Sequence, residues 1–165
     1  MSLIITQTLK LLSCLWITNA TLTILPLILK KIHIKDLALD GNRKWFDGRR
    51  ILGKSKTLIG IPVALFIGAI IGTIWSNFNE GLFLGVCTYF GTTISGFFKR
   101  RIGIKPGQPW IPFDEIDFVV GALVFVSPIY FPGLLESVII VIMSAFGHIA
   151  VNQGAFYLGI RKEKW

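Results

Sequence analysis

Three acidic residues stand close together at the start of an apolar run. Asp114, Glu115 and Asp117 precede uncharged residues that continue to Gly133. Positions three apart share a face of a helix, so Asp114 and Asp117 could hold a magnesium ion between them. The same spacing is typical of helix capping, which stays an alternative. Glu115 exceeds what a cap needs, and we interpret it as a partner for a loop cation.

Four cations lie just ahead of these acids, namely Lys99, Arg100, Arg101 and Lys105. A charged group beside a membrane must find an opposite charge, a metal ion or water. Metal and phosphate together would satisfy both signs. We therefore predict that Lys99, Arg100 and Lys105 bind the phosphates of a nucleotide and that Asp114 and Asp117 bind the metal.

A second basic segment combines glycines, lysines and hydroxyl groups. Gly48-Arg-Arg-Ile-Leu-Gly53-Lys54-Ser55 matches the P-loop pattern, but that motif needs an α/β sheet, which the polar residues upstream exclude. Its local chemistry still applies, because glycines let backbone amides approach an anion and lysines neutralise phosphate. The predicted phosphate contacts are Gly53, Lys54, Ser55, Lys56 and Thr57. A loop that rests on anionic headgroups is the alternative.

Three polar residues fall inside apolar runs: Asn19, His148 and Asn152. His148 and Asn152 are one helical turn apart and share a face. Hydrogen bonds between helices are one explanation for all three, and contact with a lipid substrate is the other.

The composition indicates a membrane protein. Hydrophobic residues make up 53% of the 165 residues and charged residues 16%, far from a soluble domain. Cys14 and Cys87 lie in apolar runs without paired spacing, so they predict buried, inert thiols. The net charge of +8 is explained by basic loops beside membrane spans rather than by nucleic acid.

We predict a single all-α membrane domain over 1–165 with five spans at about 11–29, 58–78, 81–98, 116–132 and 135–158. Nine of the seventeen cations fall in the first loop, about 30–57, and four in the second, about 99–115. The positive-inside rule makes both loops cytoplasmic and the protein a multi-pass protein of the cell membrane. A stripe of small residues, Ala64, Gly68 and Gly72, predicts close helix packing, as do Gly81 and Gly85. The stripes meet each other or a second subunit of a homodimer.

The order of Ser95, Lys99-Arg100, Lys105 and Asp114-Glu-Ile-Asp117 resembles the signature of the CTP-dependent lipid cytidylyltransferases. The bacterial phosphatidate enzymes carry Lys-Asp where this chain has Lys105-Pro106, and Arg where it has Glu115. The short chain, its five spans and the Asp47–Thr57 loop resemble the archaeal branch, the CDP-archaeol synthase family. The likeness covers nearly the whole chain.

That resemblance implies an enzyme that transfers the cytidylyl group of CTP to an isoprenoid glycerol phosphate lipid, unsaturated archaetidic acid. CDP-archaeol and pyrophosphate would be the products. It further implies Mg²⁺ as cofactor, catalysis by Asp114, Asp117, Lys56 and Lys99, and an active site that faces the cytoplasm. A small membrane transporter, a lipid-binding scaffold and, among enzymes, a phosphatidate cytidylyltransferase are the alternatives.

Overall fold

The computed structural model describes residues 2–53, 55–105, 108, 110–126 and 133–157, and only the backbone of residues 2–4, 151, 152 and 155. This part of the chain forms five helices: α1 (Ser2–Lys31), α2 (Gly60–Ile74), α3 (Phe78–Arg101), α4 (Phe113–Val126) and α5 (Leu134–Tyr157). Its extended residues make only isolated bridges, so the predicted all-α class is confirmed.

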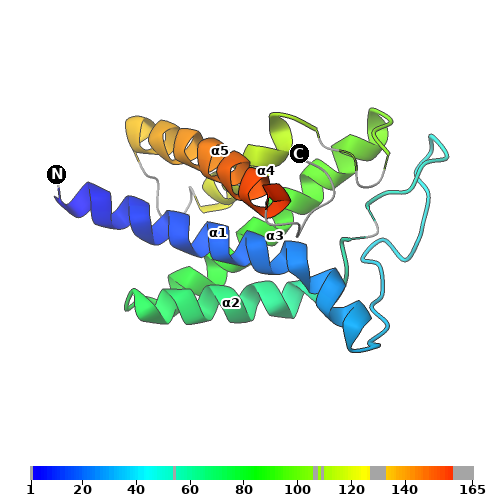
Figure 1. The fold of residues 1–165 in the computed structure, drawn as a ribbon, viewed down its shortest axis with the longest axis horizontal. Helices are drawn as coiled ribbons and strands as arrows, with labels where there is room; N and C mark the ends of the chain where they lie inside the picture. Colours follow the sequence, from blue (N-terminus) through cyan, green and yellow to red (C-terminus); the bar gives the residue numbers. More distant parts are fainter. Residues whose placement is uncertain (1, 54, 106–107, 109, 127–132, 158–165) are drawn as a thin grey trace.

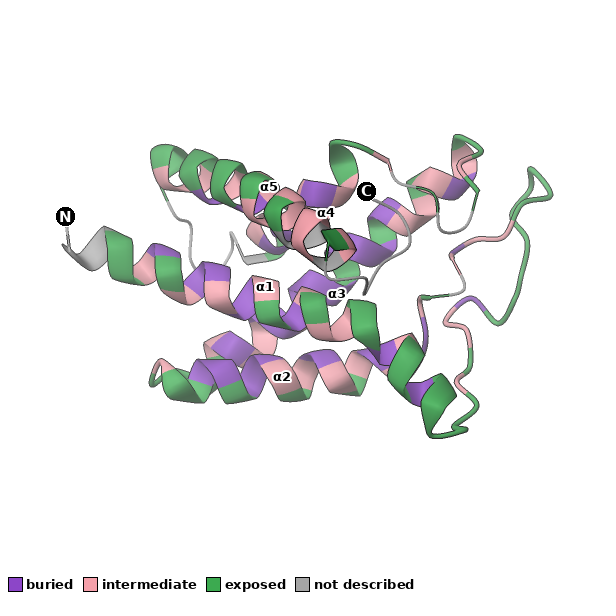
Figure 2. Cartoon of the chain, in the orientation of Figure 1, coloured by how far each residue is buried: buried purple, intermediate pink, exposed green. Residues whose placement is uncertain are grey.

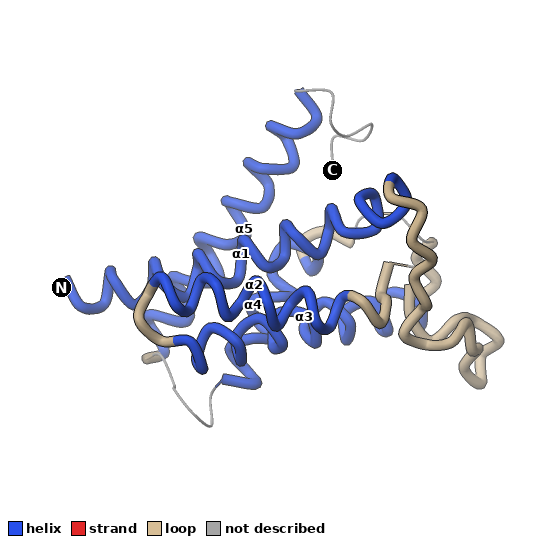
Figure 3. Tube along the Cα trace, turned by 90° about the horizontal axis from the view of Figure 1, so that it is seen from below, coloured by secondary structure: helices blue, strands red, loops and turns tan. Residues whose placement is uncertain are grey.

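The helices place the charged segments at one end of the molecule. The end of α1, the start of α2, the end of α3 and the start of α4 all point toward this end, and residues 32–53 of the connection between α1 and α2 project beyond them (Figure 1). The amino terminus lies at the opposite end. Seen from below, α5 leaves the other helices at a steep angle (Figure 3).

The outer surface of the helices is apolar, as a lipid environment requires. Phe66, Ile74 and Phe146 are about two-thirds exposed, and Figure 2 shows exposed residues along the outward sides of the helices. Ile5–Lys31 and Phe78–Arg101 are long and apolar enough to cross a membrane, whereas Gly60–Ile74 and Leu134–Ala150 are shorter apolar helices. The number of spans therefore stays a prediction.

Two helices extend beyond their predicted ends, because charged residues that we assigned to loops belong to the helices. The third helix runs over Phe78–Arg101 instead of 81–98, so Lys99 and Arg100 belong to its last turn. Asn77 begins this helix by accepting a hydrogen bond from the Glu80 amide (3.2 Å). Long basic side chains can extend a membrane helix at its end because their charged tips reach the headgroups. Likewise α1 begins at Ser2 instead of 11, because Lys10 finds a partner in Glu80 and need not end the helix.

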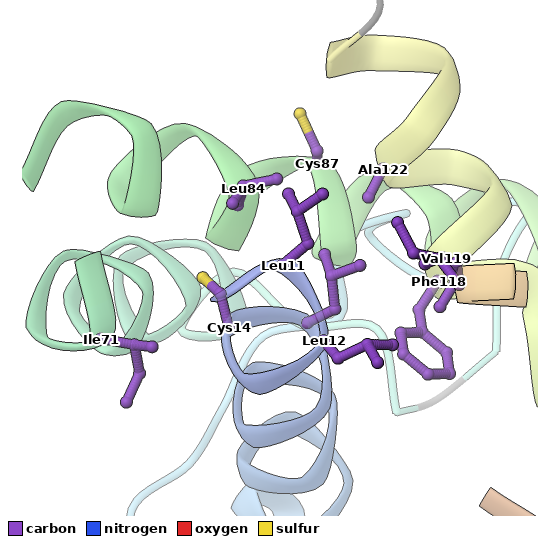
Figure 4. Packing of buried hydrophobic residues seen from close by; sticks show 11 residues of the cluster. Leu11, Leu12, Cys14, Ile71, Leu84, Cys87, Phe118, Val119 and Ala122 are labelled. Carbon is purple, nitrogen blue, oxygen red and sulfur yellow. The ribbon is translucent and has the colours of Figure 1, made fainter. Parts of the chain in front are cut away.

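The core lies where the first four helices meet, with Ile140 of α5 also buried (Figure 4). Leu11 and Leu15 of α1 pack with Leu84 of α3 and Phe118 of α4, and each is at least 97% buried. Cys14 and Cys87 are free and buried, as predicted.

Glycines let α3 approach its neighbours on both sides. A Cβ on Gly68 would lie 2.3 Å from the Gly81 carbonyl oxygen, so the predicted stripes of α2 and α3 meet inside one chain. On the other side, a Cβ on Gly121 of α4 would lie 2.2 Å from the Gly91 Cα. This second crossing was not predicted. It brings the start of α4 against the end of α3, where the predicted acids and cations lie.

Candidate active site

The segment between α1 and α2 is folded around one buried carboxylate. Asp40 Oδ1 accepts from Arg50 Nη2 (2.6 Å) and its Oδ2 accepts from the Leu52 amide (2.9 Å). Burial opposes ionisation of this side chain, but the Arg50 guanidinium and the Leu52 and Asn42 amides lower the pKa of Asp40 below its usual value. The ionised carboxylate therefore closes residues 40–52 into a fixed loop.

Two arginines fasten this loop to the end of α3. Arg49 Nη1 donates to the carbonyl oxygens of Arg100 (3.2 Å) and Arg101 (2.6 Å). Arg101 in turn donates to Asp47 Oδ1 (2.8 Å) and to the Arg50 carbonyl. Arg49 and Arg101 thus hold the loop against the end of α3 by hydrogen bonds. These contacts also fix the start of the segment that contains Lys56.

Residues 55–58 place Lys56 beside α3. The Leu39 amide donates to the Lys56 carbonyl (2.8 Å), and the Tyr89 hydroxyl donates to the Thr57 carbonyl (2.5 Å). The Lys56 side chain passes Gly96 of α3, whose Cβ, if present, would lie 3.7 Å from Cε. Its ammonium group is within electrostatic reach of Asp117 and Asp114.

The environment of Lys56 changes its protonation. Burial lowers the pKa of Lys56 to about 8, while the charges of Asp117 and Asp114 act in the opposite direction and that of Lys99 in the same direction. A partly buried lysine close to two carboxylates and a second lysine is typical of a site that binds an anion together with a cation.

Asp114 already has partners. Its Oδ2 accepts from Lys99 Nζ (2.7 Å) and from the Trp110 amide (2.9 Å). Lys99 Nζ also donates to the Gln108 carbonyl (2.9 Å). Asp114 thus closes the turn before α4 from inside the first turn of the helix, not from the cap position that the capping alternative gave it, and it holds Lys99 beside the acids.

Asp117 lies one turn further along α4, half-buried and facing the end of α3. Ser95 of α3 is buried nearby, and its Oγ makes no hydrogen bond that meets distance and angle criteria. The side chains of Ser95 and Asp117 therefore lie close together but do not form a well-aligned hydrogen bond. An unsatisfied buried hydroxyl beside a carboxylate is the kind of group that a bound ligand would satisfy.

Glu115 does not behave as we expected. It is only 4% exposed, and its Oε2 has no hydrogen-bond partner among the described residues. Among the described residues, Glu115 forms no ion pair with a loop cation, so that prediction was wrong. Glu115 instead shares the inward face of α4 with Phe118 and Val119, which explains why the loop cations do not reach it.

The acid pair has the donor chemistry of a magnesium site. Within the described residues no group of three or more His, Cys, Asp or Glu could enclose a metal. Magnesium, however, usually takes one or two carboxylates and completes its shell with water and substrate phosphates. Asp114 and Asp117, with the unsatisfied Ser95 hydroxyl beside them, fit that requirement.

Lys56 also lines a cavity of about 140 Å³. Its lining residues are Asn19, Leu22, Thr23, Leu25, Ser55, Lys56, Thr57, Gly60 and Tyr89. Asn19, which we selected as a lipid contact, therefore shares a cavity with the predicted phosphate-binding residues Ser55, Lys56 and Thr57. Tyr89 was not predicted, because nothing in sequence distinguishes a tyrosine that holds a loop from one that packs.

The remaining predicted site residues divide into three groups. Gly53 lies half-buried at the start of the Lys56 segment, and Arg100 is buried with one donor directed at the Lys105 carbonyl (3.5 Å). Lys105 is exposed, and the His148 ring contacts that of Phe118, the residue after Asp117, with 6.0 Å between centroids. Lys54 and the side chain of Asn152 lie outside the described residues.

The chain is similar to one family of enzymes. The family profile described as "CarS-like: CDP-archaeol synthase" matches residues 71–165. The CDP-archaeol synthase of Methanococcoides burtonii is 34% identical, over 77% of this chain and 89% of that protein. The CDP-archaeol synthase of Thermofilum pendens is 30% identical, over 91% of this chain and 76% of that protein.

A solved structure supports the same relationship. It is described as an intramembrane enzyme for archaeal membrane lipid biosynthesis, and it superposes with a TM-score of 0.72 at 25% sequence identity. The match covers 87% of this chain and 91% of that one.

Proposed function

The chain belongs to the CDP-archaeol synthase family, and we propose that its reaction takes place between α3, α4 and the Lys56 segment. It is a CTP-dependent nucleotidyltransferase of archaeal membrane lipid synthesis that forms CDP-archaeol. Membership of this family favours an enzyme over the transporter and scaffold alternatives. The acceptor that the family's name gives favours it over a phosphatidate cytidylyltransferase.

One observation supports the location of the site above all others. Lys56, from the connection between α1 and α2, lies close enough to the two carboxylates of α4 for their charges to act on it, and Lys99 of α3 is paired with one of them. Three segments far apart in sequence thus bring two cations and two acids together at the charged end of a membrane protein. Charges in such a place are typical of functional sites.

The chemistry is a displacement at phosphorus. An oxygen of the lipid phosphate attacks the α-phosphorus of CTP, a new P–O bond forms, and the bond to the β-phosphate oxygen breaks so that pyrophosphate leaves. No protein nucleophile is needed, so the protein must hold the two substrates in line and neutralise charge. Lys56 and Lys99 do so by donating charge-assisted hydrogen bonds to phosphate oxygens.

Asp114 and Asp117 would hold the magnesium ion that, when bound, neutralises charge on the triphosphate. Within the chain itself, Asp114 also orients Lys99 through the 2.7 Å ion pair. Binding of the nucleotide would release Lys99 from Asp114 toward a phosphate. Gly53, Ser55 and Arg100 lie around this point and would contact the rest of the triphosphate.

The acceptor's phosphate would lie in the cavity that contains Asn19. The cavity of about 140 Å³ has the size of a polar head and not of isoprenoid chains, and Lys56, on which the charges of the carboxylates act, is part of its lining. The chains would then extend along the apolar helix surfaces within the bilayer. A cytoplasmic orientation of this end would give the site access to CTP.

The test is an assay of purified protein with radiolabelled CTP, magnesium and either unsaturated archaetidic acid or a fatty-acyl phosphatidic acid. The expected result is a labelled CDP-lipid with the isoprenoid acceptor, and its loss in the Lys56→Ala variant. A Lys56→Ala variant as active as the wild type would place the reaction elsewhere in the molecule. A product formed only from phosphatidic acid would contradict the proposed acceptor.

A further inference from the structure

The connection between α1 and α2 presents two aromatic side chains on a tight turn. The Trp45 amide donates to the Arg49 carbonyl (2.7 Å) and the Gly48 amide to the Trp45 carbonyl (3.0 Å), while Lys44 and Arg50 form an isolated bridge. Phe46 lies in this turn and is 95% exposed. This phenylalanine, held fully open on a well-bonded turn, presents apolar surface that the described residues do not cover.

The turn is joined to the end of α3 by a row of aromatic contacts. Ring centroids lie 5.2 Å apart between Phe46 and Trp45, 5.5 Å between Trp45 and Phe97, and 5.7 Å between Phe97 and Phe98. The Arg101 guanidinium lies 6.0 Å from the Trp45 ring and 5.0 Å from the Phe97 ring. The turn therefore lies beside the last two turns of α3, as Figure 1 also shows.

This row continues the lipid-facing surface of α3. Phe90, Ile94, Phe98 and Ile102 follow at intervals of four residues, and each is between 43% and 57% exposed. Residues at that spacing form one stripe along a helix. Since α3 is one of the two helices with the length and apolarity of a membrane span, the stripe faces lipid. Phe46 stands at its charged end, at the level of the headgroups.

The charge around the turn has one sign. Arg43 and Lys44 are exposed beside the aromatic pair. The two acids nearest to them in sequence are engaged, Asp40 by Arg50 and Asp47 by Arg101. Aromatic rings with free basic residues at the end of a membrane helix are typical of segments that lie in the interface of an anionic leaflet.

We propose that Trp45 and Phe46 insert into the headgroup layer and that Arg43 and Lys44 bind anionic lipid there. The turn would be an anchor that holds the whole α1–α2 connection at the membrane surface. Asp40 and the Arg49–Arg101 contacts join it rigidly to the Lys56 segment. The depth of the anchor thus sets the height of Lys56 above the bilayer.

The test uses an environment-sensitive dye on the Phe46→Cys variant of the full chain in liposomes. The native thiols Cys14 and Cys87 are buried, and dye-treated wild type corrects for any labelling of them. A label on Lys35→Cys, exposed in the same connection but outside the aromatic row, is the matched control. We expect dye at position 46 to emit at shorter wavelength, to resist iodide and to be quenched by headgroup-labelled lipid. Equal exposure of the two positions to iodide would overturn the proposal.

A second variant separates the contribution of charge. The label at position 46 should become less accessible to iodide when anionic lipid is added to neutral liposomes, because Arg43 and Lys44 draw the turn inward. The Arg43→Gln, Lys44→Gln pair should abolish this difference. An unchanged response of that pair to anionic lipid would contradict the assigned role of the cations. Protection that appears only after a soluble protein fraction is added would show a protein partner and overturn the membrane assignment.

Discussion

Lys56 is the residue on which the two halves of the site depend, since it touches the Asn19 cavity and reaches the carboxylates. Replacing it with alanine removes a charge-assisted phosphate contact, which typically contributes about 1.5–3 kcal/mol. We expect kcat/KM for CTP to fall by about 10- to 150-fold. Thermal stability should change little, because the backbone of residue 56, not its side chain, binds the loop. Lys35→Ala, an exposed lysine of the same connection, should behave as wild type, and an equal loss there would indicate a general effect of loop charge.

The lowered pKa of Lys56 adds a pH dependence. The pKa is about 8, so in the free enzyme the ammonium is present below that pH and is lost as the pH rises through it. Because the charged form binds phosphate, kcat/KM should decline on the alkaline side near that value. Lys56→Arg keeps its charge and should extend the plateau to higher pH. The same alkaline limit in wild type and Lys56→Arg would assign the titration to another group.

Asp117 distinguishes metal binding from a structural role more cleanly than Asp114 does. Asp114 bonds Lys99 and the Trp110 amide, so Asp114→Asn should lower both thermal stability and activity. Asp117 lies beyond that turn, and Asp117→Asn should cost at most about 0.3–1 kcal/mol of stability while turnover collapses. The measurement is turnover and melting temperature across a magnesium titration. Near-normal turnover with an unchanged magnesium dependence would remove Asp117 from the metal site, whereas partial recovery at high magnesium would support it.

At the scale of the elements, the site exists because α3 and α4 cross at Gly91 and Gly121. A Cβ on Gly121 would lie 2.2 Å from backbone, so Gly121→Leu must push the helices apart and separate Asp117 from Ser95 and Lys56. Overpacking of this kind typically costs about 1–3 kcal/mol. We expect activity to fall further than stability, because the acids move with α4. Gly154→Leu, at a helical glycine with open space around it, is the control. Retained activity in Gly121→Leu would show that the site tolerates a wider crossing.

The sequence alone was enough to predict the helices and to select the charged candidate residues, but not to predict which distant residues contact one another. Apolar runs reveal helices, and the basic and acidic residues beside them reveal where charge must be satisfied, so Asp114, Asp117, Lys56 and Lys99 could be selected before any contact was known. The end of α3 was misjudged because Lys99 and Arg100 look like loop residues to a hydropathy argument. The Gly91–Gly121 crossing and the hold of Tyr89 on Thr57 could not be found, because both join positions about 30 residues apart without a local signal.

At the scale of the whole molecule, the helix ends and the first connection, which carry the predicted phosphate- and metal-binding residues that the structure describes, lie toward one end of the bundle. Nine of seventeen cations fall in residues 30–57, whereas the turn before α3 has none. Cations near membrane spans are retained on the cytoplasmic side, so that distribution predicts the orientation. CTP is made in the cytoplasm, and only this orientation gives the site access to it.

The orientation can be measured with single cysteines at the two ends. Lys35→Cys lies in the first connection and Asn79→Cys in the first turn of α3, and both positions are exposed. An impermeant maleimide should label Asn79→Cys in intact cells and Lys35→Cys only after the membrane is opened. The buried native thiols should stay unlabelled in both cases. Labelling of Lys35→Cys from outside would invert the topology. In that orientation the lysines and carboxylates of the site would face away from the cytoplasm and its CTP. Sealed right-side-out vesicles should then use CTP added from outside, which the predicted orientation does not allow.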